Sequence, residues 1–185
     1  MQRRSPRTYT DQLRLADDAR IEMQAIGHVA SPFRERYAAP HQPGVGEAVA
    51  GSIRLLPGHN YEQAVKDLEG FSHIWVLYWM HLNDGWNPTV IPPRGSRTRR
   101  GLFATRAPHR PNRIGLSVVE LVAVKGLELT IRNFDMLDGS PVLDIKPYIA
   151  YADSIPHARS GWLETEGLSM PTSAPSSAPT RDSGG

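Results

Sequence analysis

Most apolar residues of this chain fall into short runs that are separated by glycine- and proline-rich turns. The run FSHIWVLYWMHL at 71–82 is aromatic, β-branched and nearly continuous, which is typical of a strand buried on both faces. The segment at 127–137 alternates instead, with Leu127, Leu129 and Ile131 on one side and polar residues between them. On similar grounds we expect strands in five further segments, at 23–30, 47–56, 102–105, 114–126 and 142–149.

The connections between these segments narrow the fold class. Lys125-Gly126 separates two of the expected strands and is predicted to form a tight hairpin. Only NYEQAVKDLEG at 60–70 has a convincing helical pattern, with Gly70 as its C-terminal cap. Many short strands between glycine and proline turns are typical of an antiparallel barrel or sandwich. The sequence therefore predicts a mainly β protein of one of these two kinds.

The two ends of the chain differ from its middle. Residues 1–22 are polar and of mixed charge, which predicts a loose N-terminal arm without the apolar centre of a secretory signal. Residues 169–185 are rich in Ser, Pro, Ala and Thr, and bury too little apolar surface to offset the entropy of ordering them. We therefore expect one domain over 23–168 and a disordered low-complexity tail. No apolar stretch approaches the length of a membrane span.

Charge adds one feature to this picture. The formal net charge is only +2, but there is no acidic residue between Asp84 and Glu120. That interval contains His109 and seven arginines, which are Arg94, Arg97, Arg99, Arg100, Arg106, Arg110 and Arg113. A long basic interval without acidic residues predicts a local anion-binding face.

Cysteine and histidine content bears on metal sites and compartment. The chain has no cysteine, which rules out disulfides and thiolate metal sites and favours the cytosol. Its 7 histidines show neither HxH nor HExxH spacing, so we expect core or hydrogen-bonded histidines and no metal. A GxG at 44–46 has Val49 where a dinucleotide fingerprint needs its third glycine, and no strand precedes it. It is interpreted as a turn, or as a backbone ledge that contacts a ligand.

RAPHRPNRIGLS, at 106–117, combines charge with a fixed backbone. Pro108 and Pro111 restrict the chain and keep it out of a helix. Three guanidinium groups are then held with reduced entropy, those of Arg106, Arg110 and Arg113. Because a guanidinium fork binds carboxylate or phosphate through two hydrogen bonds, we interpret this stretch as a binding site rather than a solvated loop.

A second polar motif, LDGSPVLDIKPY, spans 137–148. Its turn, DGSP, leads into a strand in which Asp144, Lys146 and Tyr148 alternate onto one face. Such a face either lines a pocket or is solvated, and the pattern does not decide between the two.

Four long motifs in this order resemble the TsaA-like family: IGHVASPFRERYAAPHQPGVG, LEGFSHIWVLYWMH, GLFATRAPHRPNRIGLSVVEL and DMLDGSPVLDIKPYIAYADSIPHA. The likeness runs from about residue 23 to 159. It implies a small antiparallel β-barrel with one or two short helices, and a homodimer that binds S-adenosylmethionine (SAM) near its interface. It also implies methyl transfer to N6 of threonylcarbamoyl-adenosine beside a tRNA anticodon, in the cytoplasm, as in TrmO-type members.

The resemblance further implies which residues contact SAM. They are Gln42, Pro43, Gly44, His81, Leu82, Arg106, Leu116, Asp138, Gly139, Ser140 and Pro141. The chain departs from the family pattern at Arg113, which replaces a proline, and at Leu82, where glutamine is common. Its turn is DGSP rather than DGTP. Longer bacterial members carry a C-terminal domain, and the low-complexity tail is expected here in its place.

These residues lead to a mechanistic hypothesis and to two rivals. The acceptor nitrogen is urea-like and weakly nucleophilic, so a base would help, and the candidates are Asp138, Asp144 and His109. The residues expected to hold tRNA phosphates are Arg94, Arg97, Arg99, Arg100, Arg110 and Arg113. The alternative is a non-catalytic RNA-binding or regulatory barrel that retains a SAM pocket. A metal-dependent hydrolase that uses the histidines is the third hypothesis.

Overall fold

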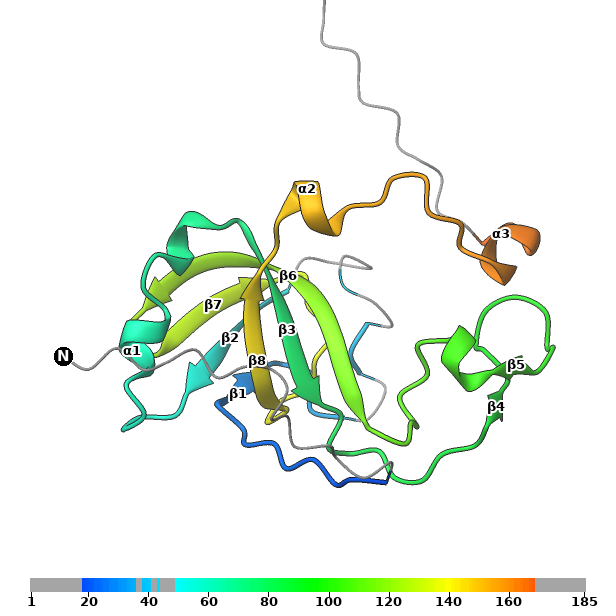
Figure 1. Cartoon of the computed structure of the whole chain (residues 1–185), viewed down its shortest axis with the longest axis horizontal. Coiled ribbons are helices and arrows are strands. Elements are labelled where there is room, and N and C mark those ends of the chain that lie inside the picture. Colours follow the sequence, from blue (N-terminus) through cyan, green and yellow to red (C-terminus); the bar gives the residue numbers. More distant parts are fainter. Residues whose placement is uncertain (1–17, 36–37, 41–42, 44–48, 169–185) are drawn as a thin grey trace, which may run out of the picture.

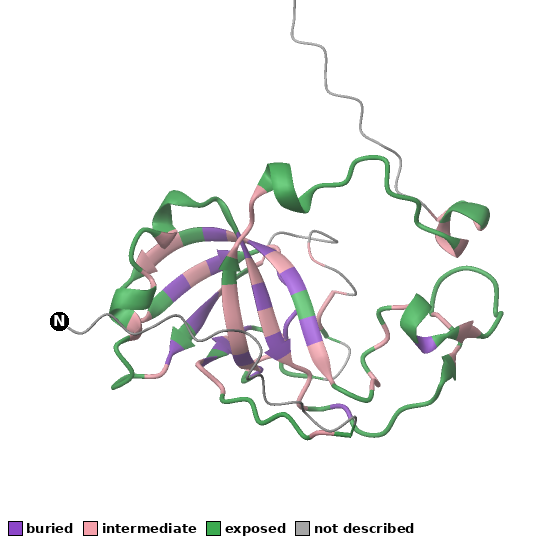
Figure 2. Cartoon of the chain, viewed as in Figure 1, coloured by how far each residue is buried: buried purple, intermediate pink, exposed green. Residues whose placement is uncertain are grey.

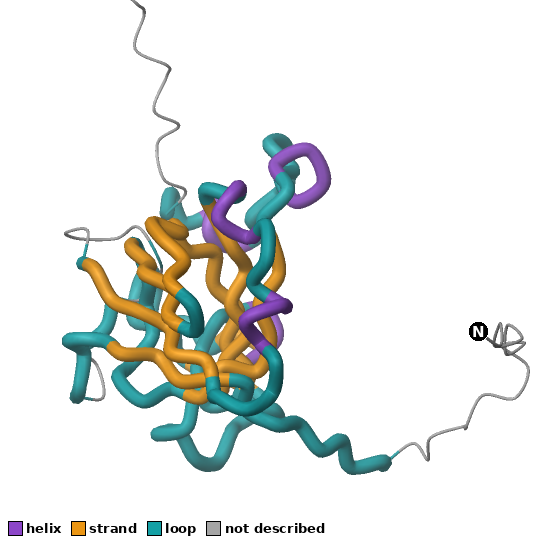
Figure 3. Tube along the Cα trace, turned by 90° about the vertical axis from the view of Figure 1, so that its left-hand side faces the viewer, coloured by secondary structure: helices purple, strands orange, loops and turns teal. Residues whose placement is uncertain are grey.

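A closed six-stranded barrel forms the centre of the computed structural model, which describes residues 18–35, 38–40, 43 and 49–168 (Figure 1). The order of strands around the barrel is β1-β2-β7-β6-β3-β8, and every neighbouring pair is antiparallel. The strands span Gly27–Ala30 (β1), Ala50–Leu55 (β2), His73–Trp79 (β3), Ile114–Lys125 (β6), Glu128–Arg132 (β7) and Pro141–Pro147 (β8). The predicted mainly β, antiparallel barrel is therefore confirmed, and Figure 3 shows the strands curving around one interior.

The interior of the barrel is filled by alternate residues of each strand (Figure 2). On β3, Ile74, Val76 and Tyr78 are buried. The outer face of β3, expected to be buried like the inner one, is only half-buried, and it carries Trp75, Leu77 and Trp79. This partly covered outer face explains why the run is apolar throughout. The buried residues of all six strands form one hydrophobic core, as burial of a strand's inner face requires.

The register brings the ends of three strands together. Trp79, the last residue of β3, pairs with Ile114, the first residue of β6. Tyr78 pairs with Val142, near the start of β8. The end of β3 and the beginnings of β6 and β8 therefore lie at the same end of the barrel, which we call the site end.

Residues 80–113 leave the barrel after β3 and return to it at β6, and we call this segment the excursion. It contains a two-stranded sheet of β4 (Thr89–Val90) and β5 (Arg100–Gly101), and the 3-10 helix η3 (Leu102–Ala104). The strand predicted at 102–105 is wrong, because three of its four residues form this 3-10 turn. The excursion lies to the right of the barrel in Figure 1, below α3 (Trp162–Thr165).

The helix predicted at 60–70 forms only in part. It is divided into α1 (Tyr61–Ala64) and the 3-10 helix η2 (Leu68–Gly70). Asp67, between them, has a left-handed backbone with φ of 66°, and such a conformation cannot continue a right-handed helix. Gly70 is the last residue of η2 rather than the cap of a long helix.

The hairpin predicted at Lys125-Gly126 is present, one residue further on. Strand β6 ends at Lys125 and β7 begins at Glu128, and Gly126 has φ of +58° in the two-residue turn between them. A further helix, α2 (Ala150–Asp153), follows β8. In the described part of the chain, no helix has the length and apolar character that crossing a membrane requires. The predicted tail, 169–185, and most of the predicted arm lie outside the described residues.

Candidate functional site at one end of the barrel

Three of the predicted SAM-contacting groups meet at the site end of the barrel. His81 and Leu82 follow β3 directly, and Leu116 is the third residue of β6. The DGSP turn leads into β8, whose Pro141 pairs with His28 of β1. The antiparallel pairing of β3 with β6 and β8 is what brings these distant parts of the sequence together. Pro43 is half-buried, whereas Gln42 and Gly44 lie outside the described residues.

The DGSP turn is held against the chain that follows β1. The amide of Asp138 donates to the carbonyl of Phe33 (2.8 Å), and the amide of Gly139 donates to that of Val29 (2.8 Å). The carboxylate of Asp138 accepts the amide of Ser31 (3.0 Å). Gly139 has φ of +71°, and a Cβ placed there would meet none of the described atoms within 4 Å. The turn is thus fixed on one side and open on the other.

The side chains that are predicted to contact SAM match its chemical groups. Arg106 is exposed, and a guanidinium can bind the carboxylate of an amino acid. Leu82 and Leu116 are large apolar side chains that are 43% and 55% exposed, which suits contact with a flat adenine ring. Asp138 can accept hydrogen bonds from an ammonium or hydroxyl group. The residues present therefore fit SAM.

Asp135, which the sequence analysis did not select, lies next to this site. The hydroxyl of Ser117, on β6, donates to Oδ1 of Asp135 (2.6 Å). The side chain of Tyr78, on β3, is buried close to both residues. Burial raises the pKa of the Asp135 carboxyl, although the Ser117 hydrogen bond and the nearby charge of Arg106 act in the opposite direction. Ser117 directly follows Leu116 on β6, so Asp135 lies on the inner side of the strand that carries this proposed SAM contact.

Tyr78 packs against Gly115 inside the barrel, next to Ser117 and Asp135. Burial raises the pKa of Tyr78 far above its usual range, and the charge of Asp135 raises it further, so this hydroxyl stays protonated. A Cβ at position 115 would overlap the ring of Tyr78, so only glycine lets the ring lie against β6. In the sequence, Asp135 stands between two large apolar residues, Phe134 and Met136, and this was a signal that could have pointed to it. Both neighbours are fully or nearly buried.

Each of the three bases proposed from the sequence has a protein partner. Asp144 forms an ion pair with Lys146 (2.7 Å) on the outer face of the barrel, opposite Leu77. That face of β8 is therefore outer surface and does not line the interior. Nδ1 of His109 lies 3.0 Å from the carbonyl oxygen of Asp84, and the carboxylate of Asp138 accepts the amide of Ser31. The role of these three groups as a base stays a prediction.

The arginines of the acid-free interval fall into two groups. Arg110 donates to the carbonyl of Thr105 (3.0 Å), and Arg113 contacts the carbonyl of Asn83 and lies 5.0 Å from the ring centre of Trp79. These two guanidinium groups hold the excursion together. Arg94, Arg97 and Arg99 are exposed on its surface, and Arg100 binds Glu166. Within the described ranges, no three histidine, aspartate or glutamate side chains are grouped as a metal site would require.

A family model described as the tRNA-methyltransferase O N-terminal domain matches residues 28–154. The chain belongs to this family. The TrmO N-terminal match covers all six barrel strands and the excursion, and it ends before α3.

Relatives within the TrmO family agree with this assignment. A tRNA (adenine(37)-N6)-methyltransferase of Escherichia coli (strain K12) is 42% identical over 152 residues, which cover 78% of this chain and 65% of that protein. A crystal structure of TrmO from Pseudomonas aeruginosa matches with a TM-score of 0.66 and 40% identity, over 78% of this chain and 63% of that one. The chain thus spans slightly less than two thirds of these two relatives.

A third relative is of the same length as the TrmO barrel itself. A protein of Methanothermobacter thermautotrophicus, named as a probable S-adenosyl-L-methionine-binding protein, is 48% identical over 138 residues. The match covers 75% of this chain and 97% of that protein. This relative is therefore matched over almost its whole length.

Proposed function

We propose that this protein is a SAM-dependent methyltransferase that acts on N6 of threonylcarbamoyl-adenosine next to the anticodon of tRNA. The observation that carries the proposal is the convergence of the DGSP turn, Leu116 and the residues after β3 at one end of the barrel, beside Asp135. Membership of the TrmO N-terminal family and the likeness to the E. coli tRNA (adenine(37)-N6)-methyltransferase support it. Such a substrate places the protein in the cytoplasm.

SAM, when bound, would supply an electrophilic methyl group: the acceptor nitrogen attacks the methyl carbon in line with the C–S bond, and the neutral thioether leaves. Arg106 would bind its carboxylate, Leu82 and Leu116 would contact its adenine, and the DGSP turn would line the same end of the barrel. The task of these residues is to align the methyl group with the acceptor and to exclude water.

Asp135 is our candidate for the group that receives the proton of N6. Its raised pKa makes its carboxylate a stronger base than an ordinary aspartate. The hydroxyl of Ser117 donates to it, which fixes the orientation of the carboxylate. Asp135 is preferred to Asp144, because burial raises the pKa of Asp135 whereas the carboxylate of Asp144 is held in an ion pair with Lys146.

The excursion is our candidate for the surface that holds the tRNA. It leaves the barrel at the site end, and it exposes Arg94, Arg97 and Arg99. Contacts of this kind bind phosphates and position an RNA without reading its sequence. The excursion would therefore bring the anticodon loop to the barrel end that holds the methyl donor.

The protein is further proposed to work as a homodimer with SAM near the interface. Leu116 lies on the outer face of β6 beside Leu77 of β3, and 55% of it is exposed. A large apolar side chain next to a cofactor site is suited to burial by a partner subunit.

The proposed reaction is tested by mass spectrometry of nucleosides from tRNA that has been incubated with the purified protein and SAM. The substrate is tRNA that carries threonylcarbamoyl-adenosine, and the control is the same tRNA transcript without that modification. A gain of one methyl group on the modified nucleoside alone is expected. Binding of SAM and RNA without any methylated product would favour the non-catalytic alternative instead.

A further inference from the structure

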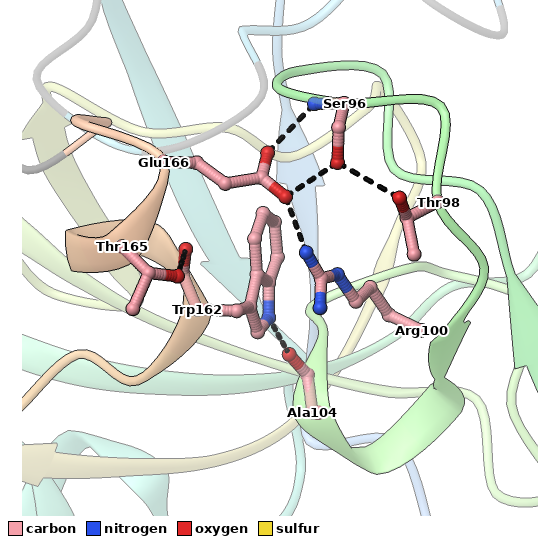
Figure 4. A network of polar contacts seen from close by, with 7 residues as sticks. All are labelled: Ser96, Thr98, Arg100, Ala104, Trp162, Thr165 and Glu166. Atoms are coloured by element: carbon pink, nitrogen blue, oxygen red, sulfur yellow. Dashed lines mark hydrogen bonds and ion pairs between the residues drawn. The ribbon is translucent and has the colours of Figure 1, made fainter.

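The segment 160–168 lies against the excursion, and Figure 4 shows the contacts that hold it there. The amide of Ser96 donates to Oε2 of Glu166 (2.6 Å), and the hydroxyl of Ser96 donates to Oε1 (2.5 Å). The guanidinium of Arg100 also binds Oε1. Only 14% of the Glu166 side chain is exposed. Both oxygens of one carboxylate are thus enclosed by donors of the excursion.

The excursion is shaped to receive this carboxylate. Gly95 has φ of +82°, and a Cβ at that position would overlap Oε2 of Glu166. The hydroxyl of Thr98 lies 3.0 Å from that of Ser96. We call this group of donors, from Gly95 to Arg100, the cradle.

Trp162 closes the contact from the other side. The guanidinium of Arg100 lies 5.1 Å from the centre of the Trp162 ring, and the indole NH donates to the carbonyl of Ala104 (2.8 Å). Both Trp162 and Glu166 therefore bind the basic part of the excursion. Each lies beyond residue 154, where the match to the family ends.

The donors of the cradle are those that bind a phosphate as readily as a carboxylate. A backbone amide, a hydroxyl and a guanidinium are the usual partners of an RNA phosphate oxygen. Arg94 directly precedes the cradle, and Arg97 and Arg99 lie within its range. All three are exposed and would attract a polyanion to it. Glu166 supplies the negative charge at the centre of this basic cluster.

We propose that the cradle is a binding site for a backbone phosphate of RNA, and that Glu166 occupies it until RNA displaces the carboxylate. This inference rests on the proposed action on tRNA, because it treats the excursion as the RNA-binding surface. It adds a defined phosphate site and an internal competitor for that site. Segment 160–168 then lowers the affinity for RNA, since only protein with an open cradle can accept the phosphate.

The test compares Glu166→Gln with Glu164→Gln in the full chain. Glu164 is an exposed residue of the same helix, and its carboxylate contacts the amide of Ser160 rather than the cradle. Both variants lose one negative charge, so their difference measures the cradle alone. The probe is an unmodified tRNA transcript, its dissociation constant is measured by fluorescence anisotropy, and no SAM is added.

Glu166→Gln is expected to bind the tRNA roughly three- to tenfold more tightly than Glu164→Gln, because the apparent affinity rises with the fraction of open cradle. Adding Arg100→Ala to both variants is expected to remove that difference. Equal affinities of the two single variants would overturn the inference, and so would weaker binding by Glu166→Gln. Weaker binding would show that the contact organises the excursion rather than blocks it.

A second measurement uses the protein without a change at position 166. Titration of tRNA into the wild type is expected to alter the emission of Trp162, identified as the part of the signal that is lost in Trp162→Phe. Emission that does not change on binding would contradict displacement of the segment. Because neither measurement requires methylation, a protein that binds in this way but modifies no tRNA would contradict the proposed function and leave the cradle established.

Discussion

At the scale of single residues, Asp135 is proposed to act as a base, and its burial is also expected to affect the stability of the fold. If it receives the proton of N6, Asp135→Asn should lower kcat by about 10²–10⁴-fold with little change in the KM for SAM. The amide keeps the shape and the acceptor for the Ser117 hydroxyl, but it cannot take up a proton. Steady-state kinetics across pH give the measurement, with Asp144→Asn as the matched control on the outer face. Equal losses in both variants would remove Asp135 from this role.

The same substitution has a second expected effect, on stability. The pKa of Asp135 is raised by burial, so the folded protein binds this proton more tightly than the unfolded chain does. The stability gained from binding this proton is fully present below the ordinary aspartate pKa. It is lost as the pH rises through the pKa of Asp135 in the folded protein. Asp135→Asn does not undergo this loss, so its Tm relative to the wild type should increase from pH 4 to pH 7. Thermal unfolding by circular dichroism measures it, and a constant difference would contradict the sign.

Gly115 supports Asp135 indirectly, through Tyr78. In Gly115→Ala the new methyl group overlaps the Tyr78 ring, so the ring must move away from β6. Such overpacking is expected to lower the free energy of unfolding by about 1–3 kcal/mol. Gly101→Ala is the control, because its φ is −58° and a Cβ there meets none of the described atoms within 4 Å. Denaturant titration measures both, and equal stabilities would contradict the role of Gly115.

Residues of the site were predictable from sequence where a motif marks them. The DGSP turn and the residues after β3 are part of long motifs, and the strand register then brings them together. Asp135 was not predicted, because it stands alone between apolar residues and its partners, Tyr78 and Ser117, come from two other strands. Its significance depends on burial and on contacts across the barrel, which a single sequence does not contain.

At the scale of elements, the contact between α3 and the excursion should depend on pH. Hydrogen bonds from Ser96, with the charge of Arg100, lower the pKa of Glu166. The stability that this carboxylate contributes is therefore present above the ordinary glutamate pKa. It is lost as the pH falls through the lowered pKa of Glu166 in the folded protein.

Acidification below about pH 4 is thus expected to open the contact. The measurement is the emission of Trp162, obtained as the difference between the wild type and Trp162→Phe during an acid titration. Glu166→Gln, which has no carboxylate to protonate at that position, should show no such step. If the emission of Glu166→Gln changed by the same amount on acidification, the change would come from the barrel and not from protonation of Glu166.

The elements that the sequence predicted well are those with strict alternation or turn chemistry. Strand β6 and the turn at Gly126 follow the expected pattern closely, since one face of the strand fills the core. The strand predicted at 127–137 ends at Arg132, because Asn133 has a left-handed backbone with φ of 55°. Position 102–105 was mistaken for a strand, because a short apolar run does not distinguish extended chain from a 3-10 turn. Helix α3 was not predicted, because its stability depends on contacts with the distant excursion.

At the scale of the whole molecule, the proposed dimer makes Leu116 the decisive position. Leu116→Glu should dissociate the dimer, because it would bury a charge in an apolar interface. Val122→Glu is the matched control, since Val122 is also on β6, is 43% exposed, and lies towards the other end of the strand. Light scattering after gel filtration gives the mass of each. A wild type that is monomeric at all concentrations would contradict the proposal.

The excursion leaves and re-enters the barrel between two residues that are paired with each other, Trp79 and Ile114. A segment anchored in this way can grow, shrink or be exchanged while the strand register stays as it is, and the entropy of closing a longer loop rises only slowly with length. If the excursion holds the tRNA as proposed, the choice of nucleic acid can diverge while the barrel is inherited unchanged. For the engineer, residues 80–113 then form a cassette, and a chimera that exchanges it would show whether RNA binding moves with the segment.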